Sequence, residues 1–288
     1  MGDDIRGRIT DQFSDRGERA DIWHVLESFL DTESYLNLGY SPWYLPHVIG
    51  SSQRRLATKI GETIAEELDA TSGRPLLDVG CGRGGPAHHL ASRFGFAVTG
   101  VDLVPHNLAL ARRSGTDPAF VLGDATRLPF EPDAFTACTA IDAIVYLPDR
   151  STVFEAVFDV LEPGGVFVFS DLLLSDDAET TYRPHVDAFA DAWDMPPLAT
   201  PTRYTDALEA AGFTDVATTD LTESSVGRFR KWTTLYRLLH ASPLGPILDW
   251  WLNEHGLDAA SIHDQLRRAH EALPALEHRL FIAHTPHE

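Results

Sequence analysis

The stretch LLDVGCGRGG at residues 76–85 constrains the fold of this chain more than any other part of the sequence. An apolar run that contains one acid, Asp78, leads into four glycines within six residues. Glycine at a strand-to-helix corner lets backbone N–H groups approach a ligand that a Cβ atom would hold away. The pattern predicts a strand, a tight turn and a helix that together form a binding site.

The residues that follow repeat this strand-and-helix pattern. Short β-like runs alternate with segments whose apolar residues have helical spacing, which is typical of a parallel sheet with crossover helices. The β-like runs are PLLDVG, FAVTGVDL, AFVLGD, FTACTAID and GVFVFSDLLL. Two partly helical excursions separate them from two further β-like runs, ending in TDVATTDL and EHRLFIAH. We therefore expect a doubly wound α/β core.

The chain is strongly acidic. Its 288 residues carry 43 acidic and 23 basic side chains, a formal net charge of −20, and only Lys59 and Lys231 are lysines. Such a chain repels polyanions, and the arginines form no basic patch in the sequence, so nucleic acid is disfavoured as its main partner. An acid excess with almost no lysine indicates adaptation to high salt; the alternative is an ordinary acidic cytoplasmic protein.

Other features of the composition bear on the compartment. No apolar run approaches 18 residues, and the charged N-terminal segment lacks the apolar core of a secretion signal. Two cysteines, Cys81 and Cys138, are too few for a disulfide framework, and no Cys/His spacing resembles a zinc site. We expect a cytoplasmic protein with no membrane span and no bound metal, and the oligomeric state is left open.

The glycine turn is compatible with three nucleotide cofactors. Gly80, Gly82 and Gly85 satisfy G-x-G-x-x-G, and Asp102 ends the next β-like run, where a dinucleotide fold places its ribose-binding acid. This match suits NAD, FAD and S-adenosylmethionine about equally. Asp78, two residues ahead of Gly80, would repel a pyrophosphate but attract a cation. The pattern favours S-adenosylmethionine, which carries a sulfonium and an ammonium group and has no pyrophosphate.

At these residues the chain resembles the class I S-adenosylmethionine-dependent methyltransferases, in particular the small-molecule enzymes of the ubiquinone/menaquinone and sterol/tocopherol type. The resemblance spans residues 76–221 and has four parts in order: LLDVGCGRGG, VTGVDL, GDATRLPFEPDAFTACTAIDAIVYLPD and LEPGGVFVFSD. It implies a doubly wound, Rossmann-like α/β fold whose seven-stranded, mostly parallel sheet has an antiparallel last strand. N-terminal helices and a helical lid complete the expected architecture.

The predicted organisation has four parts. Residues 1–70 form an N-terminal helical segment and cofactor lid, and residues 71–228 form the core that binds S-adenosylmethionine. Residues 229–276 form a helical lid over the methyl acceptor. Residues 277–288 supply the last strand of the core sheet and the tail.

The resemblance implies a set of residues around the cofactor. Asp102 binds the ribose hydroxyls, Leu103 covers the adenine, and Asp124 and Ala125 meet the adenine amino group and ring. An Asp124 that caps its own loop is the alternative. The residues expected near the methionine portion are Asp78, Gly80, Cys81, Gly82, Ala140 and Ile141.

Three further positions have competing interpretations. The run YLNLGY resembles the family's segment that closes over the cofactor, so Tyr35 and Tyr40 are candidate lid residues; aromatic core packing is the alternative. Asn107 either lines the pocket or caps its helix. Cys81 is expected to supply a small side chain in the turn rather than a reactive thiol.

Two residues are candidates for catalysis. Methyl transfer from a sulfonium is an in-line displacement whose electrophile is already activated, so alignment of the reactants supplies most of the rate. Tyr146 stands where many relatives have a histidine, and its phenol is a poor base at neutral pH, which favours orientation of the acceptor. Asp171, after the fifth strand, is the other candidate base. Asp142 is a candidate ligand for the cofactor's ammonium or the acceptor.

Aromatic residues of the variable segments suggest the acceptor. An apolar or aromatic small molecule such as a quinone or isoprenoid is favoured by the residues that lie where relatives cover their acceptor: Trp193, Met195, Trp232, Tyr236, Trp250 and Trp251. Packing of the lid helices on each other is the alternative role for these residues. The alternative within the family is an osmolyte amine N-methyltransferase, whose acceptor carboxylate would need an arginine. Four arginines are available for this role: Arg183, Arg203, Arg228 and Arg230.

Two alternatives lie outside the methyltransferase family. One is a NAD-dependent dehydrogenase, but the Tyr-x-x-x-Lys pair expected of such an enzyme is absent from the sequence. The other is a non-catalytic S-adenosylmethionine-binding protein.

Overall fold

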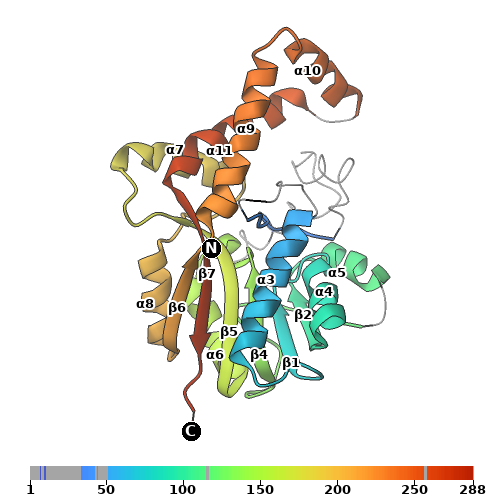
Figure 1. Ribbon diagram of the computed structural model, residues 1–288, viewed down its shortest axis with the longest axis vertical. Helices are drawn as coiled ribbons and strands as arrows, with labels where there is room; N and C mark the ends of the chain where they lie inside the picture. The colour runs from blue at the N-terminus through green and yellow to red at the C-terminus, as the bar shows by residue number, and fades with distance from the viewer. Residues whose placement is uncertain are drawn as a thin grey trace.

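A seven-stranded sheet runs through the computed structural model, which describes residues 7, 10, 34–42, 44, 51–114, 117–255 and 258–287 (Figure 1). The spatial order is β3-β2-β1-β4-β5-β7-β6. The strands are β1 (Pro75–Val79), β2 (Ala97–Asp102), β3 (Ala119–Leu122), β4 (Phe135–Ile141), β5 (Leu161–Leu174), β6 (Thr214–Asp220) and β7 (Leu276–His284). Strands β1 to β5 pair in parallel, and β7 pairs antiparallel with both β5 and β6. The predicted mostly parallel sheet with an antiparallel last strand is confirmed.

Helices cover both faces of the sheet. One face packs against α3 (Ser51–Glu67), α4 (Gly85–Phe94) and α5 (Pro105–Ala111), and the other against α6 (Arg150–Val160) and α8 (Pro201–Ala211). Residues Leu56, Ile60 and Ile64 of α3 show why: their spacing of four puts them on one side of the helix, where all three are buried. The layers are those of a doubly wound fold.

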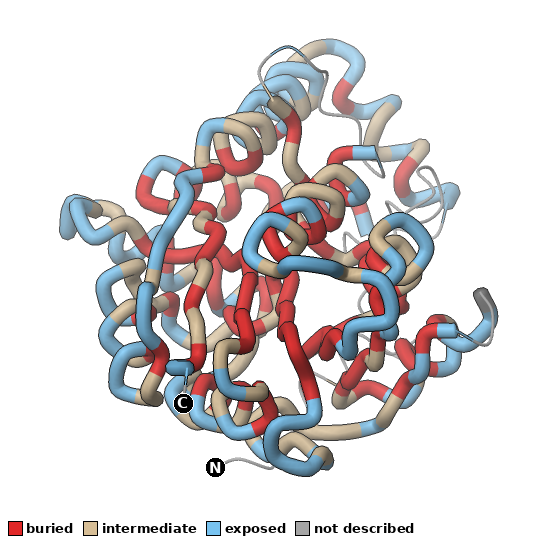
Figure 2. Tube along the Cα trace, turned by 60° about the horizontal axis from the view of Figure 1, so that its bottom comes forward, coloured by how far each residue is buried: buried red, intermediate tan, exposed pale blue. Residues whose placement is uncertain are grey.

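Alternation along β5 assigns its side chains to the two layers. Val166 and Val168 belong to the core under α3, whereas Phe167 and Phe169 belong to the core under α6 and α8. The ring of Phe169 stacks on that of Phe281 in β7 at 4.8 Å. Because both faces of the sheet are covered, the strand is apolar on both sides, and Figure 2 shows the buried strands at the centre of the molecule.

A helical cap lies beyond the ends of β5 and β7. It contains α7 (Arg183–Ala192), α9 (Val226–His240), α10 (Gly245–Glu254) and α11 (Ala259–Ala272). Their buried residues form a third core with Leu172 and Leu174 at the end of β5. In Figure 1 α9 rises away from the sheet and α10 lies at its far end.

The structure tests the predicted N-terminal helices only in part and does not test the predicted domain boundaries. Of the helices expected before the first strand, α3 is described, whereas residues 1–6, 8–9, 11–33, 43 and 45–50 lie outside the described residues. The boundaries proposed at residues 70, 228 and 276 stay a prediction. In the part of the chain that the structure describes, no helix combines the length and apolarity required to cross a membrane.

Candidate cofactor-binding and active site

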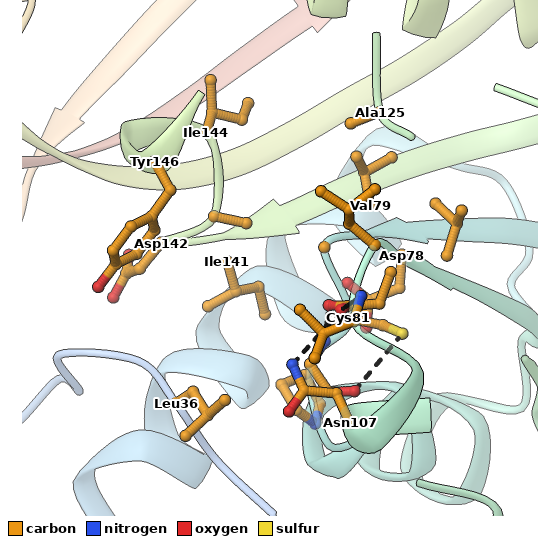
Figure 3. Close-up of a pocket in the computed structure, with 18 of the residues that line it drawn as sticks. Leu36, Asp78, Val79, Cys81, Asn107, Ala125, Ile141, Asp142, Ile144 and Tyr146 are labelled. Carbon is orange, nitrogen blue, oxygen red and sulfur yellow. Dashed lines mark hydrogen bonds between the residues drawn. The ribbon is translucent and has the colours of Figure 1, made fainter. Parts of the chain in front are cut away.

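A cleft opens at the carboxyl ends of β1, β2 and β4 (Figure 3). Strand β1 lies between β2 and β4: strands β2 and β3 are added on one side of β1, and the chain then crosses over to add β4 on the other side. Such a switch point leaves a crevice above the strand ends, because the connections on its two sides diverge. Ligands of open α/β sheets bind in this position, so the fold places the cleft where the glycine turn predicts a site.

The glycine turn after β1 forms one wall of the cleft. Gly80 has φ +69°, and a Cβ atom on it would lie 2.5 Å from the Cβ of Ala143, so the turn passes close to the end of β4. A Cβ on Gly85 would run into the carbonyl oxygen of Ser34, to which the Gly85 N–H donates at 3.0 Å. Glycine is therefore required at Gly80 by the positive φ and the methyl group of Ala143, and at Gly85 by the approach of the Ser34 backbone. Cys81 is buried and lines the cleft.

The carboxylate of Asp102 holds the glycine turn in place. Its Oδ2 accepts the Gly82 N–H at 2.8 Å, and its Oδ1 accepts the Val104 N–H at 2.8 Å and the Asn107 amide at 3.4 Å. Burial raises the pKa of Asp102, and these hydrogen bonds oppose the shift. The carboxylate lies on the cleft wall, with Leu103 beside it. A ligand hydroxyl could still donate a hydrogen bond to either oxygen of Asp102, since a carboxylate offers about four acceptor positions.

Asp78 contributes a second, unusually buried carboxyl group to the same cleft. It is 1% exposed, and its Oδ2 has no hydrogen-bond partner among the described residues. Burial, reinforced by the charge of Asp102, raises the pKa of Asp78 to about 8. A buried acid without a partner is costly unless it stays protonated or meets a cation.

The other unsatisfied polar atoms of the cleft complete a pattern. Asn107 Oδ1 and Asn37 Nδ2 are buried and have no partner in the described structure. Together with Asp78 Oδ2, these atoms give the cleft both acceptors and a donor that a ligand could use. Because buried polar groups are normally hydrogen-bonded, these atoms indicate a ligand that carries both donors and an acceptor. S-adenosylmethionine, with its ammonium, ribose hydroxyls and carboxylate, fits this requirement.

The segment 34–42 crosses the cleft as a strap. Leu38 N–H donates to Asp142 Oδ2 at 2.7 Å, and Ser41 N–H donates to the Ser224 carbonyl at 2.9 Å. The Gln53 amide of α3 donates to the carbonyl of Asn37 at 2.8 Å. The strap is therefore fixed to the end of β4, to the segment before α9 and to α3.

The strap corrects one prediction. Tyr35 does not face the cleft: its side chain is buried in the core with α3 and α4, and Leu36 and Asn37 line the cleft instead. Tyr40 is half-buried against the same core. The alternative of aromatic core packing holds for both tyrosines.

Asp142, at the end of β4, is the centre of a buried network that the sequence did not reveal. Its Oδ1 accepts the Ser170 hydroxyl at 2.6 Å and lies 2.9 Å from Nε2 of His278, a fully buried residue of β7. The His278 Nδ1 lies 2.8 Å from Ser225 Oγ, which donates to the Leu221 carbonyl at 2.9 Å.

The network fixes an otherwise unfavourable backbone. Asp142 has φ +55°, a left-handed conformation that persists only where surrounding contacts determine it. Burial alone would raise the pKa of Asp142, but the charge of His278 and the hydrogen bonds from His278, Ser170 and Leu38 outweigh it, so the pKa is lowered. His278 lies 136 positions from Asp142 in the sequence, which is why no local pattern signals the pair.

Asp171 and Ala140 lie away from the cleft, which corrects both predictions. Asp171 is fully buried on the face of the sheet under α8, where the hydroxyl of Tyr204 donates to its Oδ2 at 2.7 Å. Burial raises the pKa of Asp171 to about 7, against the Tyr204 hydrogen bond. Ala140 is buried in the same core, one residue before Ile141, which does line the cleft. Neither side chain can reach a ligand in the cleft.

The remaining predicted residues line the cleft. Asp124 and Ala125 follow β3, and Tyr146 lies in a short 3₁₀ turn (Ile144–Tyr146) beyond β4. Asp124 also caps its own loop, since its Oδ1 accepts the N–H and the hydroxyl of Thr126 at 2.9 and 2.8 Å. Both interpretations of Asp124 are thus compatible with its position. Among the described residues no group of three or more histidine, cysteine or acidic side chains could hold a metal ion.

Comparison with known proteins identifies the family. The model of the methyltransferase domain matches residues 77–169, from β1 to β5. An O-methyltransferase of Penicillium expansum, cnsE, is 30% identical over 200 residues, which cover 66% of this chain and 69% of that protein. The chain is a class I S-adenosylmethionine-dependent methyltransferase. Its cofactor is S-adenosylmethionine, and its acceptor is a small molecule.

Two further proteins show how far the likeness extends. The 2-methyl-6-phytyl-1,4-hydroquinone methyltransferase of a Synechocystis strain is 31% identical over 160 residues, and the methyltransferase spans about half, 50%, of its length. The fold is that of the geranyl diphosphate C-methyltransferase of Streptomyces coelicolor, solved with Mg²⁺, geranyl-S-thiolodiphosphate and S-adenosylhomocysteine: the TM-score is 0.71 at 16% identity, with 97% of each chain covered. That likeness concerns the fold alone.

Proposed function

We propose that the methyltransferase acts on an apolar or aromatic small molecule, such as a quinol or an isoprenoid. In this proposal Asp102 binds the ribose hydroxyls of S-adenosylmethionine and Asp78 binds its ammonium. Asn37 binds its carboxylate, with Asn107 beside the ribose. The cofactor supplies a methyl group already activated by the sulfonium, so the protein's own residues need to bind, orient and exclude water.

The observation that carries the acceptor class is the lining of the cleft beyond β4. Ile144, Tyr146 and Leu147 form that end, and Ile141 lies between it and the glycine turn. Asp142 is there too, but its oxygens already accept hydrogen bonds from Leu38 and Ser170 and contact His278. An apolar wall with one phenol suits a ring or an isoprenoid chain better than a charged acceptor, because a charged group needs a partner when it leaves water.

The osmolyte amine alternative is weaker on this geometry. Its acceptor would bring a carboxylate, and none of Arg183, Arg203, Arg228 and Arg230 is among the residues that line the described cleft. Arg228 donates to the carbonyl of Pro42 at 3.1 Å. Arg83 lines the cleft, but from the glycine turn.

Orientation is the role that we propose for Tyr146. The residue lies at the acceptor end of the cleft, and a phenol with its ordinary pKa near 10 removes protons poorly at neutral pH. Asp171, the other candidate base, lies under α8 and cannot take part. The catalytic contribution then comes from alignment and from exclusion of water.

An acceptor screen tests the proposal. Quinols, phenols, sterols and isoprenoids are compared with glycine and its N-methyl derivatives, with S-adenosylhomocysteine as the measured product. We expect turnover with at least one apolar acceptor and none with the glycine series. Asp102→Asn is the matched control, because it keeps the shape but weakens cofactor binding. Turnover confined to the glycine derivatives would overturn the proposal in favour of the osmolyte enzyme.

The charge and composition support two wider proposals. A net charge of −20 disfavours a nucleic acid as acceptor. Two free, buried cysteines suit the reducing conditions of the cytoplasm. Fractionation of the source cells would test the compartment.

A further inference from the structure

The strap is anchored on two walls of the cleft. On the wall formed by the glycine turn, the carbonyl of Ser34 accepts the N–H of Gly85 at 3.0 Å. On the wall at the end of β4, Leu38 N–H donates to Asp142 Oδ2 at 2.7 Å. Asn37 lies between these anchors and lines the cleft, one residue from the bond to Asp142. The carboxylate of Asp142 therefore fixes the part of the strap that faces a ligand.

Asn37 is held so that one polar group is left for a ligand. Its side-chain Oδ1 accepts the N–H of Gly39 at 3.1 Å, and its backbone carbonyl accepts the amide of Gln53 at 2.8 Å. The residue is only 2% exposed, yet its Nδ2 has no hydrogen-bond partner among the described residues. Buried donors are normally paired. Both acceptor groups of Asn37 already have partners, so the Nδ2 donor is the group that remains for an acceptor such as the carboxylate of the cofactor.

His278 determines the charge state of the carboxylate that anchors Leu38. Burial alone would raise the pKa of Asp142, but the charge and the hydrogen bond of His278, with two further hydrogen bonds, lower it, so the group is ionised. An ionised carboxylate only accepts, so His278 Nε2 donates its N–H across the 2.9 Å contact. Without this donor, burial would drive Asp142 towards its protonated form, whose oxygens bind an N–H less strongly. His278 therefore keeps Asp142 able to anchor Leu38.

His278 acts on the strap from a distance. It is fully buried and is not among the residues that line the described cleft. Its Nδ1 lies 2.8 Å from Ser225 Oγ, its N–H donates to Thr222 Oγ1 at 3.1 Å, and its carbonyl accepts the N–H of Leu221 at 2.8 Å. The ring and the main chain are both fixed, so His278 can hold Asp142 in one orientation without touching a ligand.

We propose that His278 is a positioning residue for the methionine end of S-adenosylmethionine. It orients Asp142, which anchors Leu38 and thereby presents the Nδ2 of Asn37 to the carboxylate of the cofactor. The inference rests on the role given to Asn37 under the proposed function and is independent of the acceptor. The contacts proposed for the ribose and the adenine lie at Asp102 and after β3, so they should not depend on His278.

Two ligands of the same site separate this role from a general effect on folding. S-adenosylhomocysteine carries the ammonium and the carboxylate, whereas 5′-methylthioadenosine has the same adenosine and a thioether without them. The dissociation constants of both are measured by calorimetry. Asn37→Ala should weaken binding of S-adenosylhomocysteine about 10- to 150-fold, as for one charge-assisted hydrogen bond, and change that of 5′-methylthioadenosine less than about twofold.

His278→Phe should show the same selectivity for S-adenosylhomocysteine, with a loss of about tenfold or more. His278→Gln keeps an N–H donor and should restore most of the affinity. In the double variant Asn37→Ala, His278→Phe the loss should equal that of Asn37→Ala alone, because His278 acts through Asn37.

Two further variants separate the proposed role from loss of stability. Ser170→Ala is a milder change that removes the other side-chain donor to Asp142 Oδ1. It should weaken S-adenosylhomocysteine about threefold or more and leave 5′-methylthioadenosine unchanged. Tyr204→Phe is the matched control, because it removes the side-chain donor of Asp171, a buried carboxylate that lies away from the cleft. It should change neither dissociation constant.

The outcomes distinguish the two assignments. If Asn37→Ala weakens both ligands equally or weakens neither, the role of Asn37 is wrong and the inference about His278 falls with it. If Asn37→Ala is selective but His278→Phe and Ser170→Ala spare S-adenosylhomocysteine, or weaken both ligands alike, the inference alone is overturned. Losses that multiply in the double variant would also overturn it, since His278 would then act independently of Asn37.

Discussion

Asp78 makes the binding of S-adenosylmethionine depend on pH. In the free protein burial and the charge of Asp102 raise the pKa of Asp78 to about 8, so the group is protonated at neutral pH. A cation against its unpartnered Oδ2 favours the ionised form. Cofactor binding should therefore release the proton of Asp78. The free protein should also lose stability as the pH rises from the ordinary carboxyl range towards 8, since the folded state holds this proton and the unfolded chain does not.

The magnitude follows from the shifted pKa. At pH 6.5 a group with a pKa of about 8 is about 97% protonated, so ionisation on binding releases about one proton for each cofactor bound. The affinity should then rise about tenfold for each pH unit between 6 and 7.5. Titration calorimetry at pH 6.5 in two buffers of different ionisation enthalpy measures the released proton directly. The ammonium of the cofactor stays mostly protonated at this pH, because its ordinary pKa is about 7.7–8.0.

Asp78→Asn is the matched control for this experiment. The amide keeps the shape and the neutral charge of the protonated acid, so proton release should disappear while the affinity at pH 6 changes little. At pH 8 the variant should bind roughly 10- to 150-fold more weakly, the equivalent of one charge-assisted hydrogen bond of about 1.5–3 kcal/mol. If the wild type releases no more protons than the variant, Asp78 does not meet the cation and the assignment is refuted.

Four further outcomes are expected. Tyr146→Phe should lower turnover about ten- to a hundredfold with cofactor affinity unchanged, as for the loss of one positioning hydrogen bond; unaltered turnover would make the residue structural. Tyr204→Phe should lower the free energy of unfolding by about 1–3 kcal/mol in a denaturant titration, because it leaves buried Asp171 without its hydrogen-bond donor. Its turnover number should equal that of the wild type; a lower turnover number would indicate a catalytic Asp171. Removing one partner of the buried pair in His278→Phe should cost about 3–5 kcal/mol, and because the pKa of Asp142 is lowered, this difference in unfolding free energy should shrink as the pH falls below about 4. His278→Gln, which keeps a donor, should lose less. Thermal melting should shift upward in molar KCl if the acidic surface is adapted to salt, and an equal or lower midpoint would count against that adaptation.

Local patterns in the sequence were sufficient for the frame of the site. The glycine turn, the acid at the end of β2 and the alternation of strands and helices depend on neighbours in the chain, and all of them appear where expected. Asp78, Asp102 and Tyr146 line the cleft because each lies at or just beyond the carboxyl end of a parallel strand, and these ends meet at one edge of a sheet.

The tertiary structure decided the side-chain directions and the distant partners. Side chains along a strand alternate between faces, so the pairing register turns Ser170 towards Asp142 and Asp171 towards Tyr204, and it separates Ile141 from Ala140 in the same way. In a strand that is apolar on both faces the sequence shows no alternation of polar and apolar residues, so it does not predict which face each side chain occupies.

Distant partners have the same origin. The contact of His278 with Asp142 exists because β7 enters the sheet beside β5 and brings a histidine to a carboxylate 136 positions away. The sequence by itself determined which cofactor the turn can hold, since that depends on adjacent residues. Only the folded sheet decided which side chains surround the reacting centre, since that depends on strands whose order along the chain differs from their order in space.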